Sequence, residues 1–199
     1  MIRSARFAAV LAPPADDLVH ALKYGGWPEA ADEMARTMLR VLPSAGAGGR
    51  RLLVPVPTTP ARARRRGYNQ AEVLARALAR RGGGDVHELL QRTRSSESQV
   101  ALHRAERMAN VSGAFSPVRT ARFNAGKADV VVLIDDVLTT GATASAAALA
   151  LGEIGLDGVH LATYGRALPV EQEGTRSLLP PPGFFEKWIR SEGPPGPTR

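Results

Sequence analysis

Cysteine is absent from the 199-residue chain, which excludes disulfides and thiolate-bound metal sites. Aromatic residues make up only 5% of the chain, so the side chains on which single-stranded nucleic acids stack are sparse. No run of about 18 apolar residues occurs, and the N-terminus has no long apolar stretch. We therefore expect a soluble, cytoplasmic protein without membrane insertion.

Acidic residues are also in deficit, since 19 of them face 26 lysines and arginines, for a formal net charge of +7. A basic balance suits polyanionic ligands, either phosphorylated metabolites or nucleic acid, and does not choose between them. A GC-rich genome that favours arginine and alanine is the alternative explanation. The length fits one domain with an appended segment.

The most informative stretch begins with five branched apolar residues at 130–134, which predict a strand buried on both faces. Asp135 and Asp136 follow at its carboxyl end, where open α/β sheets place their ligands. Two carboxylates there suit the hydroxyl groups of a ligand. The alternative is a buried strand whose Asp136 or Thr139 only caps the next helix.

A short loop then leads into an alanine-rich segment, predicted to be helical to about Ile154. The loop consists of Thr139, Thr140, Gly141, Ala142 and Thr143. Backbone N–H groups at the start of a helix bind anions, and a phosphate monoester is the natural guest. Together with the carboxylates, the loop predicts a ligand with vicinal hydroxyls and a nearby phosphate, such as a ribose 5-phosphate unit.

A second candidate anion site follows the short apolar strand 52–57. Residues 57–67 read as an arginine-bearing loop, with Arg65, Arg66 and Gly67 as the contacts for a doubly charged group such as pyrophosphate. Asn69 and Glu72 predict a capping box at the start of the next helix. The alternatives are a solvated basic loop and a nucleic-acid contact.

Two motifs carry a resemblance to known families. Residues 131–143 resemble the thirteen-residue phosphoribosyl-pyrophosphate (PRPP) signature of type I phosphoribosyltransferases. Residues 54–57 together with 66–72, Arg-Gly-Tyr-Asn-Gln-Ala-Glu, resemble the hallmark of the ComF (ComFC) family of competence-associated proteins. The likeness continues through a polar run and covers roughly residues 18–166. That run contains Arg92, Thr93, Arg94, Gln99, Leu102, Arg104, Arg107, Asn110, Gly113, Ala114 and Phe115.

The resemblance implies an α/β fold of the type I phosphoribosyltransferase kind: a mostly parallel twisted sheet flanked by helices, with a small helical N-terminal hood. The alternation of strands and helices independently favours a parallel sheet. We expect a helical segment at 1–50, the phosphoribosyltransferase core at 51–168 and a Pro/Gly-rich tail at 169–199. Within the first segment, residues 1–14 read as a lead-in, and Lys23 reads either as a cation offered to a ligand or as a solvated side chain.

The resemblance also implies roles for the site residues. Asp135 and Asp136 would hold the ribose hydroxyls and stabilise positive charge at the anomeric carbon, and residues 139–143 would hold the 5-phosphate. A mobile segment that closes over PRPP would contain Arg92, Arg94 and Gln99. Mg²⁺ would arrive with PRPP, without direct protein ligands. No zinc is expected, because the four-cysteine ribbon common in the family is missing and the histidines lack ligand spacing.

The resulting hypothesis is a PRPP-binding phosphoribosyltransferase-like enzyme, a pentosyltransferase that transfers or hydrolyses the phosphoribosyl group, with no acceptor identified. The alternative is a PRPP sensor without turnover, or a factor that handles single-stranded DNA in DNA uptake. In that case, single-stranded DNA or competence and recombination proteins would be its partners. An oligomer is compatible with either hypothesis, and a degenerate scaffold fits the intact acidic pair poorly.

Overall fold

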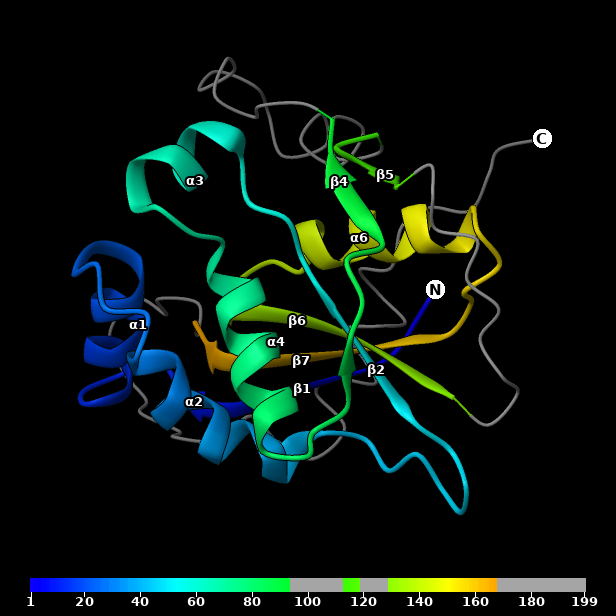
Figure 1. Cartoon of the computed structure of the whole chain (residues 1–199), viewed down its shortest axis with the longest axis horizontal. Helices are drawn as coiled ribbons and strands as arrows, with labels where there is room; N and C mark the ends of the chain where they lie inside the picture. The colour runs from blue at the N-terminus through cyan, green and yellow to red at the C-terminus, as the bar shows by residue number, and fades with distance from the viewer. Residues whose placement is uncertain (94–112, 119–128, 168–199) are drawn as a thin grey trace, which may run out of the picture.

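A five-stranded sheet forms the centre of the protein (Figure 1). The computed structural model describes residues 1–93, 113–118 and 129–167. The strand order is β1 (Ile2–Val10), β7 (Val159–Arg166), β6 (Val130–Leu138), β2 (Arg51–Pro55) and β3 (Asp85–Val86). Every neighbouring pair in this order is parallel. The predicted mostly parallel α/β sheet is confirmed, and the architecture is compatible with a type I phosphoribosyltransferase-like fold.

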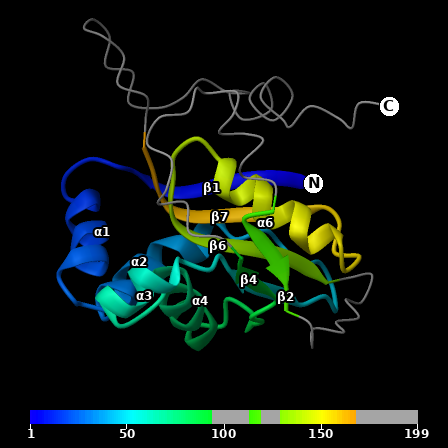
Figure 2. The same cartoon turned by 90° about the horizontal axis from the view of Figure 1, so that it is seen from above.

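Helices cover both faces of the sheet (Figure 2). On one face lie α1 (Ala15–Tyr24), α2 (Ala30–Met38) and α4 (Gln70–Arg80), with the 3₁₀ turn η1 (Leu39–Val41) after α2. On the other face lie α6 (Ala142–Gly152) and a two-stranded antiparallel ribbon of β4 (Leu90–Arg92) and β5 (Phe115–Pro117). The described helices include none that is long and apolar enough to cross a membrane.

The sheet is buried because its apolar side chains alternate between two cores. Leu53, Val132 and Ile134 pack toward α2 and α4, whereas Val54 and Leu133 pack toward α6. All five side chains have no exposed surface. A strand covered on both faces needs apolar residues at every position, which explains the unbroken apolar run that begins β6.

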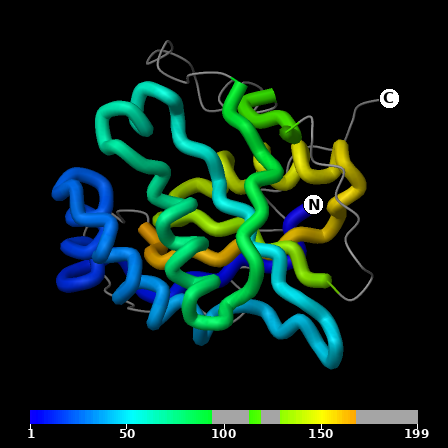
Figure 3. Tube along the Cα trace, in the orientation of Figure 1, coloured from blue at the N-terminus to red at the C-terminus, as the bar shows by residue number. Residues whose placement is uncertain are grey.

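The N-terminal residues differ from the sequence prediction. Residues 1–14 were expected to be a lead-in, and this is wrong, because β1 is an edge strand that pairs with β7 from Ile2 opposite Val159. Figure 3 shows β1 (blue) and β7 (orange) running side by side. Arg3 and Arg6 interrupt the apolar pattern of β1, as an edge strand tolerates and a central strand does not. The domain divisions at residues 50 and 168 stay predictions.

Candidate ligand-binding site

A pocket of about 370 Å³ opens at the carboxyl ends of β2 and β6. After β2 the chain passes through α4 on one face to β3, and after β6 it passes through α6 on the opposite face to β7. The carboxyl edge between such strands is the switch point at which open α/β sheets bind ligands. Figure 1 shows α1 and the short helix α3 (Pro60–Arg66) on the side toward which the strands run. The pocket is lined by Lys23, Tyr24, Val56, Pro57, Thr58, Arg62, Arg65, Arg66, Gln70, Arg92, Asp135, Asp136 and Thr143.

The acidic pair lies on the floor of this pocket. Asp136 is 7% exposed, and its Oδ2 lies 3.0 Å from Nζ of Lys23. Oδ1 of Asp135 accepts a hydrogen bond of 2.9 Å from the backbone N–H of Asp136. Both residues belong to β6 itself, which runs on to Leu138 and does not end before them as the sequence had suggested. The strand therefore fixes both carboxylates against a rigid backbone.

The pKa of Asp135 is raised from 3.8 to about 8. Burial is the largest cause, because it disfavours the charged form, and the neighbouring charge of Asp136 acts in the same direction. The backbone N–H of Asp136 and the charge of Lys23 oppose the rise. Asp135 therefore keeps its proton to a higher pH than an exposed aspartate does, and a ligand that donates hydrogen bonds would favour its ionisation.

The loop after β6 borders a smaller cavity of about 30 Å³, which shares Asp135 and Thr143 with the main pocket. Of the five predicted phosphate-binding residues, Thr139, Gly141 and Thr143 line it. Gly141 precedes α6 in the left-handed conformation, with φ of 79°, which glycine adopts without strain. The first amides of an α-helix lack intrahelical acceptors, so this cavity suits an anion. Thr140 and Ala142 line neither cavity; the hydroxyl of Thr140 accepts from the N–H of Ala142 at 3.4 Å.

The predicted arginine loop is in fact a helix, α3 (Pro60–Arg66). The hydroxyl of Thr59 caps it by accepting from the backbone N–H of Arg62 at 3.2 Å, and Gly67 ends it with φ of 84°. Arg65 and Arg66 line the pocket as predicted, whereas Gly67 does not. The loop interpretation missed Arg62, which shares the helical face of Arg65 and Arg66. Thr59 and Pro60, a cap and a first-turn proline, could have revealed this helix.

Two buried polar atoms in the pocket wall have no hydrogen-bond partner among the described residues. They are Nε of Arg66 and Nε2 of Gln70, a side chain that is 4% exposed. The guanidinium of Arg66 also lies 5.2 Å from the centre of the Tyr24 ring. A buried donor without an acceptor is unfavourable, so a ligand rich in oxygen atoms would stabilise this wall. The sequence prediction assigned no role to Gln70, although it lies in the Arg-Gly-Tyr-Asn-Gln motif.

Asn69 is the N-cap residue of α4 as predicted, but the capping box is wrong, because no side-chain hydrogen bond caps the helix. The Asn69 side chain donates through Nδ2 to the Val56 carbonyl at 3.3 Å, and Glu72 pairs with Arg76 at 2.9 Å. Asn69 thereby holds the segment after β2 against the start of α4, which places Gln70 at the pocket.

Among the candidate residues of the mobile segment, only Arg92 lies within the described residues; Arg94 and Gln99 lie outside them. The guanidinium of Arg92 lies 5.0 Å from the centre of the Phe115 ring and donates to the Pro57 carbonyl at 3.4 Å. Burial lowers the pKa of Arg92, and the charge of Arg62 contributes. Arg92 is thus part of the pocket wall.

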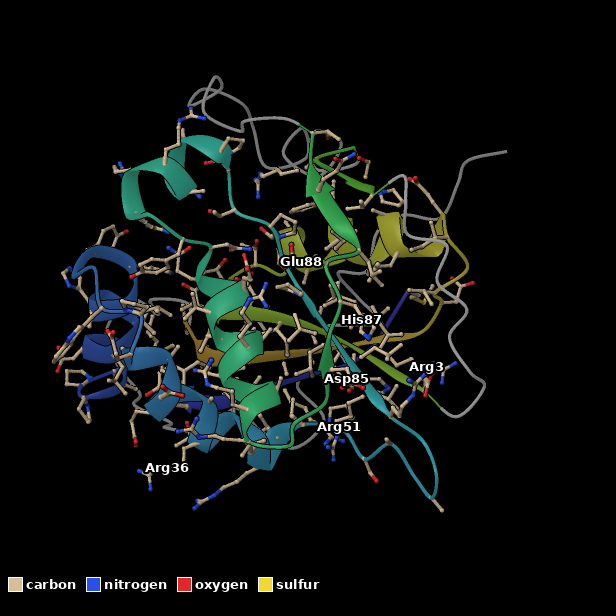
Figure 4. All side chains as sticks on the ribbon, in the orientation of Figure 1. Arg3, Arg36, Arg51, Asp85, His87 and Glu88 are labelled. Atoms are coloured by element: carbon tan, nitrogen blue, oxygen red, sulfur yellow. The ribbon has the colours of Figure 1, made fainter. Side chains whose placement is uncertain are left out.

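Positive charge gathers at this pocket, where five cationic side chains face two carboxylates. Several arginines elsewhere pair with acids instead: Arg36 projects from α2 beside Glu33 (Figure 4), and Arg80 and Arg81 both contact Asp32. Within the described residues no group of three His, Cys, Asp or Glu side chains could hold a metal ion. The site therefore suits a polyanion that also carries hydroxyl groups.

No family model matches the chain. The DNA utilization protein YhgH of Escherichia coli K12 is 33% identical over 144 residues, which are 66% of this chain and 58% of YhgH. Competence protein F of Haemophilus influenzae is 32% identical over 117 residues, 58% of this chain and 50% of that protein. Competence protein ComFC of Bacillus subtilis is 35% identical over 104 residues, 52% of this chain and 39% of ComFC. The chain thus spans between two fifths and three fifths of these relatives.

Proposed function

Since the chain belongs to the ComF (ComFC) family of competence-associated proteins, we propose that its pocket binds PRPP with Mg²⁺ and that the protein transfers or hydrolyses the phosphoribosyl group. The observation that carries this proposal is the meeting of the acidic pair and the arginine face of α3 in one pocket. A volume of about 370 Å³ lies within the range of small-molecule sites.

Each part of PRPP has a counterpart in the site. The ribose hydroxyls donate to Asp135 and Asp136. The 5-phosphate occupies the smaller cavity at the start of α6. The pyrophosphate contacts Arg62, Arg65 and Arg66, whose forks match phosphate oxygens, and the amide of Gln70 supplies a further hydrogen bond.

Reaction breaks the bond between the anomeric carbon and the pyrophosphate oxygen. Positive charge then develops on the ribose ring, and the carboxylates at its hydroxyls stabilise it, while the arginines of α3 stabilise the departing pyrophosphate. Mg²⁺ bound through the oxygens of PRPP would neutralise part of the pyrophosphate charge. The acceptor is water or a nucleophile that enters from the open side of the pocket.

Calorimetric titration with PRPP and Mg²⁺ tests binding. We expect Asp135→Asn/Asp136→Asn and Arg65→Gln to weaken it by about tenfold or more, because a charged hydrogen bond contributes roughly 1.5–3 kcal/mol. Arg64→Gln is the matched control, since Arg64 carries the same charge on the same helix but does not line the pocket. Absence of binding to the wild type, or equal binding by all variants, would refute the proposal. Release of pyrophosphate on incubation separates an enzyme from a PRPP sensor.

A second candidate function is the handling of single-stranded DNA, and one relative is named a DNA utilization protein. The observation that favours it is a pair of aromatic side chains, Tyr24 and Trp27, each 63% exposed. The ring of Tyr24 lies 5.2 Å from the guanidinium of Arg66 on α3. The sequence prediction had overlooked both. Binding of an oligothymidylate should fall steeply with salt and with Trp27→Ala, whereas PRPP binding should respond much less to either.

A further inference from the structure

Lys23 forms an ion pair inside the pocket. It lies in the last turn of α1, and its side chain and that of Asp136 are 24% and 10% exposed. The pair between Arg80 and Asp32, by comparison, has side chains 59% and 42% exposed. Attraction between charges is stronger where water is partly excluded. The contact therefore holds the Lys23 and Asp136 side chains together in the empty pocket.

This contact conflicts with the proposed use of Asp136. Lys23 occupies Oδ2, an oxygen that a ribose hydroxyl needs if Asp136 is to accept from the ligand. A lysine that stayed in place would compete with the ligand, and one that left without a new partner would remain a partly buried, unpaired cation. The pyrophosphate of the same ligand offers such a partner.

A hydrogen bond holds the backbone next to Lys23. The Tyr68 hydroxyl, on the segment between α3 and α4, donates to the Leu22 carbonyl at 2.7 Å. This bond ties the end of α1 to the end of the arginine helix. The flexible four-carbon stem of lysine can then redirect its ammonium without movement of the helix.

We propose that Lys23 is a positioning residue that changes partner on ligand binding. It holds Asp136 in the empty pocket and contacts a pyrophosphate oxygen once ribose hydroxyls occupy Asp136. The charged groups that face it across the pocket are Asp135 and Asp136 from β6, the three pocket arginines of α3, and Arg92 from β4. This inference rests on the proposed function. It adds a residue that selects ligands carrying both ribose hydroxyls and a pyrophosphate.

The test compares Lys23→Met with the wild type against three probes: PRPP with Mg²⁺, pyrophosphate with Mg²⁺, and ribose 5-phosphate. We expect Lys23→Met to weaken the binding of PRPP and of pyrophosphate by about tenfold or more. Binding of ribose 5-phosphate should stay unchanged or tighten, because the competitor for Asp136 is gone. Lys23→Arg should restore most of the pyrophosphate affinity. Arg64→Met is the control for loss of one positive charge outside the pocket.

Equal weakening of all three probes would overturn the inference, since it would show that Lys23 only holds the pocket in shape. If Lys23→Met bound all three probes as tightly as the wild type does, the inference would be overturned as well. If Lys23→Met does not give a folded protein by thermal melting, the ratio of the pyrophosphate and ribose 5-phosphate affinities of Lys23→Gln decides between the same outcomes. A wild type that binds neither PRPP nor ribose 5-phosphate refutes the proposed function itself, and this inference with it.

Discussion

The partly buried carboxyl of Asp135 should make the stability of the protein depend on pH. Its pKa is 3.8 when exposed and about 8 in the folded protein. Between these values the folded state holds a proton that the unfolded state releases, so the contribution of Asp135 to stability is full below pH 4. That contribution declines as the pH rises and is lost above pH 8.

The perturbation is Asp135→Asn, which removes the ionisation and keeps an oxygen for the Asp136 N–H. At about 1.36 kcal/mol per pKa unit, the full shift corresponds to roughly 6 kcal/mol. Only the part of the shift between pH 5 and about pH 8 falls in the measured range, and water that enters the open pocket on ionisation lowers it further. Between pH 5 and pH 9 we therefore expect the wild type to lose roughly 2–4 kcal/mol relative to the variant.

Urea denaturation of both proteins at several pH values measures the difference. Asp32→Asn is a suitable control, because hydrogen bonds from Arg80 and Arg81 lower the pKa of Asp32 and leave it ionised throughout this range. Its effect on the free energy of unfolding should be the same at pH 5 and pH 9. Parallel curves for the wild type and Asp135→Asn would show that the carboxyl is solvated, and the burial argument would fail.

Two further predictions concern the ends of α3. Thr59→Val removes the hydroxyl that caps this helix and should lower the free energy of unfolding by about 0.5–2 kcal/mol and weaken pyrophosphate binding. Thr59→Ser keeps the cap and should leave pyrophosphate binding unchanged. Denaturation measures the stability and calorimetry measures the binding. Gly67→Ala should destabilise by roughly 1–2 kcal/mol through backbone strain alone, because a Cβ there meets no atom within 4 Å and φ is +84°. A neutral Gly67→Ala in thermal unfolding would contradict the left-handed assignment.

The central strand and the acidic pair could be predicted because both follow from local rules. An unbroken apolar run indicates a strand buried on both faces, and carboxylates at its end indicate a ligand. The edge strand β1 could not be recognised in the same way, since its arginines break the pattern and its pairing with β7 is remote in the sequence. The helix α3 was missed because a run of arginines suggested a loop, although Thr59 and Pro60 carried a start signal.

The remaining site residues depend on tertiary structure. Lys23 reaches Asp136 only because α1 is held beside the carboxyl end of the sheet, and no spacing in the sequence predicts that contact. The unpartnered amide of Gln70 likewise becomes visible only when its burial is known. The basic composition suggested a positively charged site. It could not show which arginines line the pocket and which pair with acidic residues elsewhere.

The strand order also determines when the sheet can be completed during synthesis. Among the described strands, β1 comes first in the chain and pairs with β7, which comes last. While the ribosome makes the residues between them, β1 lacks its partner strand. Its backbone edge and its apolar side chains stay exposed until β7 emerges. Contacts between such distant segments form slowly and leave strand edges exposed meanwhile. Nascent chains that stop before β7 should therefore be the ones that chaperones and proteases engage.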